Sequence, residues 1–386
     1  MWRFVAFGLV MIAVVVAGFS LIDISVDGGE VTASTVLTDM QVDASKFARA
    51  YEVRDWQFPQ DYGPHPDFQT EWWYYTGNLA DANGRRFGYQ FTIFRRAITP
   101  ADTSSDSEWR TGQVYMVHFT VSDIVGETFY HDERFSRGGA GLAGATVDPR
   151  YRVWLENWQV KALNDQATQT HISANTEGAA IDLTLEQIKP PALQGDQGLS
   201  PKSAEPGNAS YYYSLSRLVT QGTVTIGDET FTVSGNTWKD HEFSTSALGG
   251  DALGWDWFGL IFDDNRELMI GQIRLVGGDS EPAFGGLLVE ADGSTRKLDS
   301  GDFTISALDT WTSPHTGAVY PAGWDISLAL EDAETLDFRA TPLMPDQELH
   351  GSGIAYWEGA VELSGDVSGY GYAELTGYAD AMTGRF

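Results

Sequence analysis

Short runs of alternating or aromatic-rich residues, separated by turn residues, fill the chain after about residue 50. Examples are EWWYYTGNLA (71–80), FGYQFTIFRR (87–96), VYMVHFTVSD (114–123) and LMIGQIRLV (268–276). Such runs predict β-strands, whereas helical periodicity is hard to find here. Many short strands divided by Gly, Asn and Asp predict an all-β sandwich or barrel. The 42 glycines fit the bulges and corners of strongly curved sheets.

An internal repeat divides the chain. The segment WYYTGNLADANGRRFGYQ (73–90) aligns without a gap to WDWFGLIFDDNRELMIGQ (255–272). Both segments are typical of a β-hairpin whose turn carries Asp and Asn. We therefore expect two related β-domains, roughly 50–245 and 246–386, with a site near their boundary, where ligands often bind.

The chain opens with MWRFVAFGLVMIAVVVAGFSL, in which one Arg precedes an apolar run over residues 4–21. This pattern predicts a secretory signal peptide or an uncleaved membrane anchor within residues 1–24. We therefore expect an exported chain that is periplasmic, anchored to the outer face of the inner membrane, or extracellular. The sequence contains no cysteine, so no disulfide can form.

Composition narrows the range of partners. The net charge is −30, from 54 acidic and 24 basic residues. Such a field repels phosphate backbones and anionic headgroups, so we expect no nucleic-acid partner. The aromatic content is high, with 13 Trp, 16 Tyr and 20 Phe. It favours β-structure or the lining of a site for an apolar ligand.

The first candidate segment is TEWWYYTGNL. In an extended strand, side chains alternate between faces, so Glu71 and Trp73 share one face while Trp72 and Tyr74 share the other. Aromatic rings on both faces indicate a strand that is buried on both sides. Glu71 is then either a desolvated acid with a raised pKa, or a carboxylate paired with an arginine such as Arg95 or its neighbour.

The second candidate segment is WKDHEF. Alternation places Trp238, Asp240 and Glu242 on one face and His241 and Phe243 on the other. Asp240 and His241 therefore cannot form a triad-style pair unless a bulge turns them together. The sequence has no Gly-x-Ser-x-Gly elbow and no His-Glu-x-x-His helix, and its His residues are scattered. We expect no metal and no cofactor.

The third candidate segment is GWDWFG. Here Trp255 and Trp257 share one face, while Asp256 and Phe258 share the other. If Asp256 points inward, its neighbours are aromatic and its carboxyl group can stay protonated. The alternative is an aspartate at a strand end whose carboxylate is bonded to loop amides.

These segments resemble a known family. HPDFQTEWWYYTGNL, GYQFTIFRRA, GNTWKDHEF, GWDWFGLIFDDNRELMIGQIR and YWEGAVELSGDVSGYGYAELTGY are similar to the AttH/CrtC family. This family includes secreted proteins labelled as predicted hydrolases and the bacterial carotenoid 1,2-hydratases. The similarity runs from about Tyr51 to the C-terminus. The resemblance implies two tandem lipocalin-like β-barrel domains.

In the hydratase branch, a carboxylic acid protonates an isoprenoid double bond and water captures the resulting carbocation. The resemblance implies Asp256 as the proton donor and His241 as the residue that orients water or substrate, with Asp240 and Glu71 as further catalytic candidates. The expected aromatic lining comprises Trp72, Tyr74, Trp238, Phe243, Trp255, Trp257 and Phe258. The chain has Glu242 and Phe243 where the family has Gln and Trp, which removes a ring from the expected pocket.

Two functions follow from these observations. One is an exported lyase or hydrolase that acts on an isoprenoid or another lipid. The other is a non-catalytic carrier of a hydrophobic molecule at the cell envelope, working beside an ABC-type transporter as the other branch of the family suggests. An enzyme needs its acidic side chain for turnover, whereas a carrier does not.

Overall fold

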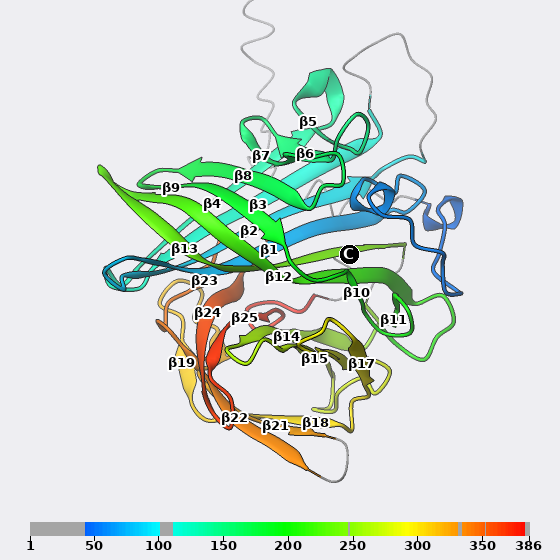
Figure 1. Cartoon of the computed structure of the whole chain (residues 1–386). Helices are drawn as coiled ribbons and strands as arrows, with labels where there is room; N and C mark the ends of the chain where they lie inside the picture. Colours follow the sequence, from blue (N-terminus) through cyan, green and yellow to red (C-terminus); the bar gives the residue numbers. More distant parts are fainter. Residues whose placement is uncertain (1–42, 101–110, 246–247, 331–333, 352, 383–386) are drawn as a thin grey trace, which may run out of the picture.

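The computed structural model describes residues 43–100, 111–245, 248–330, 334–351 and 353–382. Within these ranges the chain forms two large curled sheets whose strand pairs are antiparallel (Figure 1). Helical structure in the described ranges is limited to short 3₁₀ turns, namely η1 (Ala44–Lys46), η2 (Gln60–Tyr62) and η3 (Gly139–Gly141). The prediction of an all-β chain is confirmed.

The first sheet has 13 strands within the described residues. They are β1 (Thr70–Asp81), β2 (Arg86–Ala97), β3 (Gln113–Asp123), β4 (Thr128–Arg137), β5 (Ala143–Thr146), β6 (Arg152–Leu155), β7 (Trp158–Ala162), β8 (Gln169–Thr176), β9 (Ala179–Gln187), β10 (Ala192–Leu193), β11 (Leu199–Pro201), β12 (Ala209–Ile226) and β13 (Glu229–Ser244). Their order is β4-β3-β2-β1-β13-β12-β9-β8-β7-β6-β5, with β10 and β11 paired to β12.

The second sheet has 10 strands in the same described ranges. They are β14 (Ala252–Phe262), β15 (Glu267–Leu275), β16 (Gly286–Val289), β17 (Thr295–Leu298), β18 (Phe303–Ala307), β21 (Trp324–Ala329), β22 (Thr335–Pro342), β23 (Glu348–Leu349), β24 (Tyr356–Gly365) and β25 (Gly369–Leu375). Their order is β17-β16-β15-β14-β25-β24-β22-β21-β18, with β23 paired to β24, while β19 (Thr310–Thr312) and β20 (Val319–Pro321) form a separate ribbon.

Each sheet closes most of the way around its own apolar core. The first core contains Trp73, Tyr75 and Phe91 among many others, and the second contains Phe258 and Leu260. Alternating side chains produce this arrangement, because every second residue of a strand points into the barrel. The two barrel-like sheets confirm the predicted pair of lipocalin-like β-barrels.

The predicted boundary at 245/246 falls between β13 and β14, although the division into separate domains stays a prediction. The apolar segment within residues 1–24 lies outside the described residues, so export and anchoring stay predictions as well. Across the part of the chain that is described, no helix combines the length and the apolar character that a membrane span requires.

The repeated segments both form hairpins, β1–β2 and β14–β15. The gapless alignment, however, pairs Trp73 inside the first barrel with Trp255, which lies outside the core of the second. Strand β1 ends at Asp81 and β14 ends at Phe262, one residue earlier than that alignment requires. A slip of one residue moves every side chain to the opposite face, so the hairpin match is confirmed but the residue pairing is wrong.

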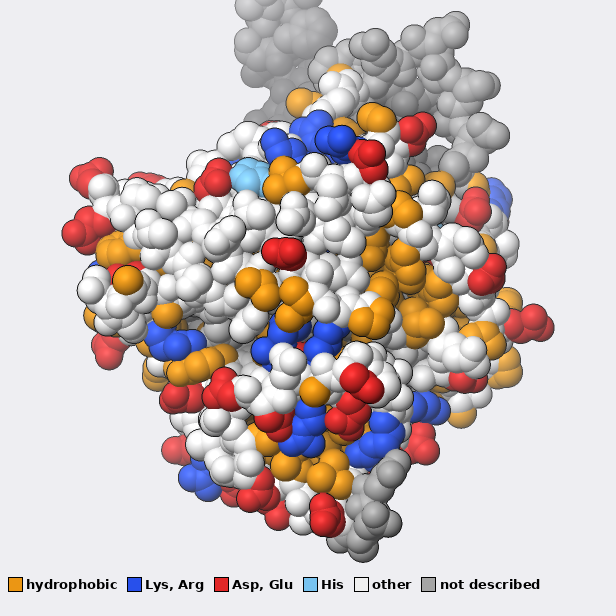
Figure 2. All heavy atoms as spheres, viewed as in Figure 1, with side chains coloured by type: hydrophobic (Ala, Val, Ile, Leu, Met, Phe, Trp, Pro, Cys, Tyr) orange, Lys and Arg blue, Asp and Glu red, His pale blue; other side chains and the backbone are white. Residues whose placement is uncertain are grey.

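The two barrels pack directly against each other. Strands β1, β12 and β13 of the first contact the second through an apolar cluster that is separate from both cores (Figure 1). Its buried members are Tyr74, Tyr212, Trp238, Trp257, Met269, Ala360 and Tyr372. Acidic side chains are spread over the visible face of the molecule and do not gather in one patch (Figure 2).

A buried carboxylate also joins the barrels. Glu267 of the second barrel is fully buried, and its oxygens lie 2.9 Å from Lys189 Nζ and 2.5 Å from Arg217 Nε of the first. Ser216 donates a further hydrogen bond of 3.0 Å to the same carboxylate. Both cations also donate to backbone carbonyls of the second barrel, so this cluster joins the two barrels.

We expect Glu267→Gln to lower the free energy of unfolding by roughly 3–5 kcal/mol, because it leaves two largely buried cations without their anion. Urea unfolding followed by tryptophan fluorescence measures this loss. The matched control is Asp325→Asn, which breaks an ion pair with Arg339 in which both side chains are about half exposed. Equal losses in the two variants would contradict the role of Glu267.

Candidate active site between the barrels

A cavity of about 110 Å³ lies between the two barrels. Its apolar lining consists of Trp72, Tyr74, Phe94, Tyr212, Leu248, Trp255, Trp257, Ile273 and Phe284. Its polar lining consists of Thr92, Lys202, Asp240, Glu242, Ser244 and Glu374. Both barrels contribute, so the site exists only when they are packed together. Aromatic walls with a few converging polar groups are typical of a binding site for a small molecule.

Strand pairing sets the acidic groups among the rings. In the first sheet, Asp240 of β13 lies opposite Tyr74 of β1 and Ser214 of β12. Two residues further along β13, Glu242 lies opposite Trp72 and Tyr212. Residues that are directly opposite in an antiparallel pair share a face of the sheet. The cavity face of the first barrel therefore alternates carboxyl groups with aromatic rings.

Asp240 is a buried acid of the first barrel that lines the cavity. Burial raises the pKa of its carboxyl group from 3.8 to about 7. This happens although the carboxyl group accepts hydrogen bonds from Tyr212 Oη at 2.7 Å, Ser214 Oγ at 2.5 Å and Trp238 Nε1 at 2.7 Å. These donors lower the pKa, whereas the nearby charge of Glu242 adds to the effect of burial. Asp240 can therefore hold or release a proton near neutral pH.

Two further acids come from the second barrel. Glu374 of β25 lines the cavity. Burial and the charges of Asp240 and Glu242 raise its pKa to about 7, although a hydrogen bond from Trp255 acts in the opposite direction. Across the β24–β25 pair from Glu374 lies Glu358, which is fully buried and accepts a hydrogen bond of 2.6 Å from Tyr74 Oη. Burial, followed by the charge of Glu374, raises the pKa of Glu358 well above its usual range. Acids this close titrate as a group, so they share protons.

Lys202 is the only basic residue among the described lining residues. Its Nζ atom lies 2.7 Å from Glu242 Oε1 and stands over the rings of Tyr212 and Phe284, at 5.4 and 4.7 Å from their centroids. Lys202 therefore pairs with Glu242, and among the described residues no ion pair joins Asp240 or Glu374 to a basic side chain. This arrangement favours their protonated forms.

Asp256 does not line this cavity. It is buried on the opposite face of β14, where it accepts hydrogen bonds from Gln272 Nε2 at 2.7 Å, Arg274 Nε at 3.1 Å and Tyr378 Oη at 3.0 Å. Burial raises its pKa, while Arg274 and the other donors oppose that shift. The predicted alternation holds, because Trp255 and Trp257 line the cavity and Asp256 is turned to the other face of β14, so the proton donor implied by the resemblance does not line this cavity.

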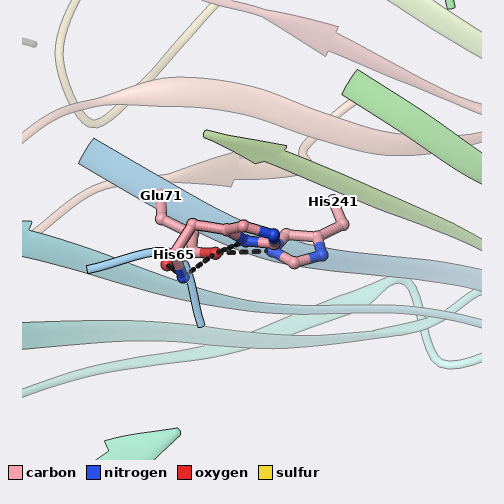
Figure 3. Close-up of side chains that lie close together, drawn as sticks. All are labelled: His65, Glu71 and His241. Carbon is pink, nitrogen blue, oxygen red and sulfur yellow. Dashed lines mark hydrogen bonds and ion pairs between the residues drawn. The ribbon is translucent and has the colours of Figure 1, made fainter. Parts of the chain in front are cut away.

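Glu71 lies inside the first barrel and is paired, as the second interpretation of the sequence expects, with Arg95. Glu71 Oε2 is 2.8 Å from Arg95 Nε, and Oε1 is 2.8 Å from both His65 Nδ1 and His241 Nε2 (Figure 3). Burial alone would raise the pKa of Glu71, but Arg95 and the two imidazoles hold it well below its usual range. Of the two alternatives for Glu71, the ion pair with Arg95 is therefore the one that the structure has.

His241 points into the first barrel, away from Asp240. Burial lowers the pKa of His241 to about 3, so its imidazole is neutral. Its Nδ1 atom lies 2.9 Å from Tyr213 Oη, and its ring stacks on Trp73 with centroids 4.9 Å apart. Strand β13 has no bulge at this point, so the prediction that the two residues occupy opposite faces is confirmed. His241 cannot orient water in the cavity between the barrels.

The predicted aromatic lining divides into two groups. Trp72, Tyr74, Trp255 and Trp257 line the cavity, and Trp238 lies behind Asp240 with its ring 6.1 Å from that of Trp257. The other two predicted rings face the barrel interiors. Phe243 stacks on His65 in the first barrel, and Phe258 packs into the second core.

Several residues of the site escape the sequence analysis. Glu358 and Glu374 are acids within the otherwise apolar runs YWEGAV and YAEL, and that pattern could have identified them. Tyr212 lies in the aromatic run SYYYS and could have been identified in the same way. Lys202, in contrast, lies in a loop whose position depends on packing between the barrels.

The raised pKa of Asp240 gives a testable dependence of stability on pH. The folded protein holds a proton that the unfolded chain releases, so the free energy of unfolding should fall as the pH rises from about 4 to about 7. We expect Asp240→Asn to show a smaller fall, because the amide does not titrate. Urea titrations across this pH range measure both slopes, with the exposed Asp325→Asn as the control. Identical slopes for Asp240→Asn and the unaltered chain would contradict the assignment.

Comparisons with known proteins agree with this architecture. The AttH-like family matches residues 49–378. The crystal structure of an AttH protein from Nitrosomonas europaea is 33% identical, covers 86% of this chain and 100% of its own, and superposes with a TM-score of 0.75. Kievitone hydratase from Nectria haematococca is 14% identical, covers 87% of this chain and 97% of its own, has a TM-score of 0.64, and shares the fold. No curated protein matches the sequence. The chain belongs to the AttH-like family.

Proposed function

We propose that this protein is a hydratase-like enzyme that binds a hydrophobic, unsaturated small molecule, an isoprenoid or another lipid, in the cavity between its barrels. Asp240 is the proton donor in this proposal. The observation that carries it is a buried carboxyl group whose pKa of about 7 lets it keep a proton inside a cavity lined by aromatic rings. A general acid works best when its pKa lies near the working pH.

The reaction is an addition of water to a carbon–carbon double bond. The π electrons of the double bond take the proton from Asp240, which forms a carbon–hydrogen bond and leaves a carbocation on the neighbouring carbon. A water oxygen then attacks the carbocation, and the excess proton of that water returns to the Asp240 carboxylate. The carboxyl group is regenerated, so no other reactant is needed. A hydrolase would use the same group as its general acid.

The cavity walls suit a transition state that carries positive charge. The indole faces of Trp72, Trp255 and Trp257 attract cations through their π electrons, and this attraction grows when water is excluded. The carboxyl groups of Glu242 and Glu374 line the same space. Groups fixed in advance where charge develops stabilise a transition state more than mobile water does.

The resemblance to a hydratase supports the proposal only through the fold, since one fold can carry many reactions. The same apolar cavity would also suit a carrier that holds a lipid at the cell envelope. The two functions differ in their need for the acid, because a carrier needs the shape of Asp240 but not its proton.

Asp240→Asn keeps the shape of the side chain and removes the proton, so we expect turnover to fall by roughly 10²- to 10⁴-fold with little change in ligand binding. The candidate substrates are the lipids extracted from the purified protein and a panel of acyclic isoprenoid alkenes. Incorporation of oxygen from isotopically labelled water, followed by mass spectrometry, measures the reaction. Asp256→Asn is the matched control, because it changes a buried acid that lies on β14 and faces away from the cavity.

The outcomes separate the alternatives. Full turnover in Asp240→Asn, or a loss only in Asp256→Asn, would contradict the proposed proton donor. A protein that retains a lipid but adds no labelled oxygen to any candidate would be a carrier.

An amine that resembles the carbocation should bind in the cavity more tightly than the neutral molecule of the same shape. We expect an isoprenoid amine, charged at neutral pH, to bind about tenfold more tightly than the corresponding hydrocarbon, because the rings and carboxyl groups attract its charge. Quenching of tryptophan fluorescence measures both affinities. Trp257→Leu should reduce the difference, whereas equal affinities in the unaltered protein would contradict this account of the walls.

A further inference from the structure

Three side chains inside the first barrel bring together atoms that can bind a metal ion. His65 Nδ1, Glu71 Oε1 and His241 Nε2 all lie within 4.8 Å of one another (Figure 3). Glu71 lies on β1 and His241 on β13, while His65 lies in the segment that precedes β1. The sequence does not reveal this group, because His241 is 170 residues from Glu71, although His65 is only six residues from it.

Each of these side chains is held by a second partner through its remaining polar atom. His65 Nε2 is 3.0 Å from Asp61 Oδ1, His241 Nδ1 is 2.9 Å from Tyr213 Oη, and Glu71 Oε2 is 2.8 Å from Arg95 Nε. Histidines that bind metals are usually oriented in this way, with the free ring nitrogen bonded to a carboxylate or another polar group. One ring nitrogen of each histidine is thus directed at Glu71 Oε1, at 2.8 Å in both cases.

Packing also fixes the two imidazole rings. The ring of His65 is nearly parallel to that of Phe243, with centroids 3.6 Å apart, and the ring of His241 stacks on Trp73. Glu71 and His241 are fully buried, whereas the side chain of His65 is 11% exposed. An ion could therefore reach the site from the side of His65, where the preceding segment meets solvent.

We propose that His65, Glu71 and His241 form a binding site for one divalent transition-metal ion, with Zn²⁺ as the preferred ion. Imidazole nitrogen and carboxylate oxygen are the ligands that zinc takes in proteins, and two histidines with one glutamate form a known set of three. The ion would replace the protons that now link the two imidazoles to Glu71, as metal binding to histidine generally does.

The surrounding charges are compatible with an ion at this point. Arg95 and Arg54 lie near the site, and each has a carboxylate partner. Arg54 is 2.6 Å from Asp61, and Arg95 is 2.8 Å from Glu71. These four charges cancel, and the buried Lys239, which also acts on His241, has a pKa that burial lowers to about 7.

The position of the site indicates its role. It lies on the opposite side of β13 from the cavity between the barrels, so it is independent of the proposed reaction. An ion would fasten the segment before β1 to two strands of the first barrel, and we expect it to stabilise the folded chain.

The test uses the full chain, freed of metal by a chelator and then titrated with Zn²⁺ and with Co²⁺. We expect about one ion to bind per chain, a visible absorption band with Co²⁺, and a rise in Tm with excess Zn²⁺. His65→Ala should weaken binding by at least about tenfold and remove the rise in Tm. Tyr213→Phe removes only a hydroxyl group and should weaken binding by roughly 10- to 100-fold, so it decides the matter if His65→Ala does not fold.

The chain provides a matched control in a second group of histidines. The ring of His350 lies 4.0 Å from that of His315 and 4.5 Å from that of His131, between centroids, and His315 is exposed. His315→Ala should bind Zn²⁺ as the unaltered chain does, and so should Asp240→Asn. Failure of the unaltered chain to bind, or binding that is lost in His315→Ala but kept in His65→Ala, would overturn the proposal.

Discussion

Strand β13 holds two neighbouring polar residues in two different environments, and the rest of the structure depends on this constraint. Alternation turns Asp240 toward the cavity between the barrels and His241 into the first barrel. Both side chains lose contact with water, and burial acts on them in opposite directions. It raises the pKa of Asp240 to about 7 and lowers that of His241 to about 3. One strand thus supplies a protonated acid to one site and a neutral imidazole to another.

The second barrel helps to bury Asp240, and this burial outweighs the hydrogen bonds that lower the pKa of its carboxyl group. Trp257 Nε1 of the second barrel donates a hydrogen bond of 3.2 Å to Tyr212 Oη, which in turn donates to Asp240. Glu374 of the second barrel adds a like charge to the same space. The ion pairs of Glu267 hold the barrels in this arrangement. The chemistry proposed for the cavity is therefore a property of the pair of barrels.

Alternation along the strands predicts much of this arrangement from the sequence. It gives the all-β fold, the burial of β1 on both faces and the opposite directions of Asp240 and His241. It cannot tell whether a face meets its own barrel or the neighbouring one when both are apolar, so it does not decide whether Asp240 or Asp256 lines the cavity. Residues such as Glu374 and Lys202 reach the cavity through packing between elements far apart in the sequence, which local patterns do not record.

The central claim is that Asp240 stays protonated near neutral pH, and infrared spectroscopy can observe this proton directly. A protonated carboxyl group has a carbonyl stretching band that a carboxylate lacks. At about pH 6, where an ordinary aspartate is ionised, the account predicts such a band in the folded protein and its reduction in Asp240→Asn. A spectrum at that pH with no protonated carboxyl band, or one that is unchanged in the variant, would contradict the account.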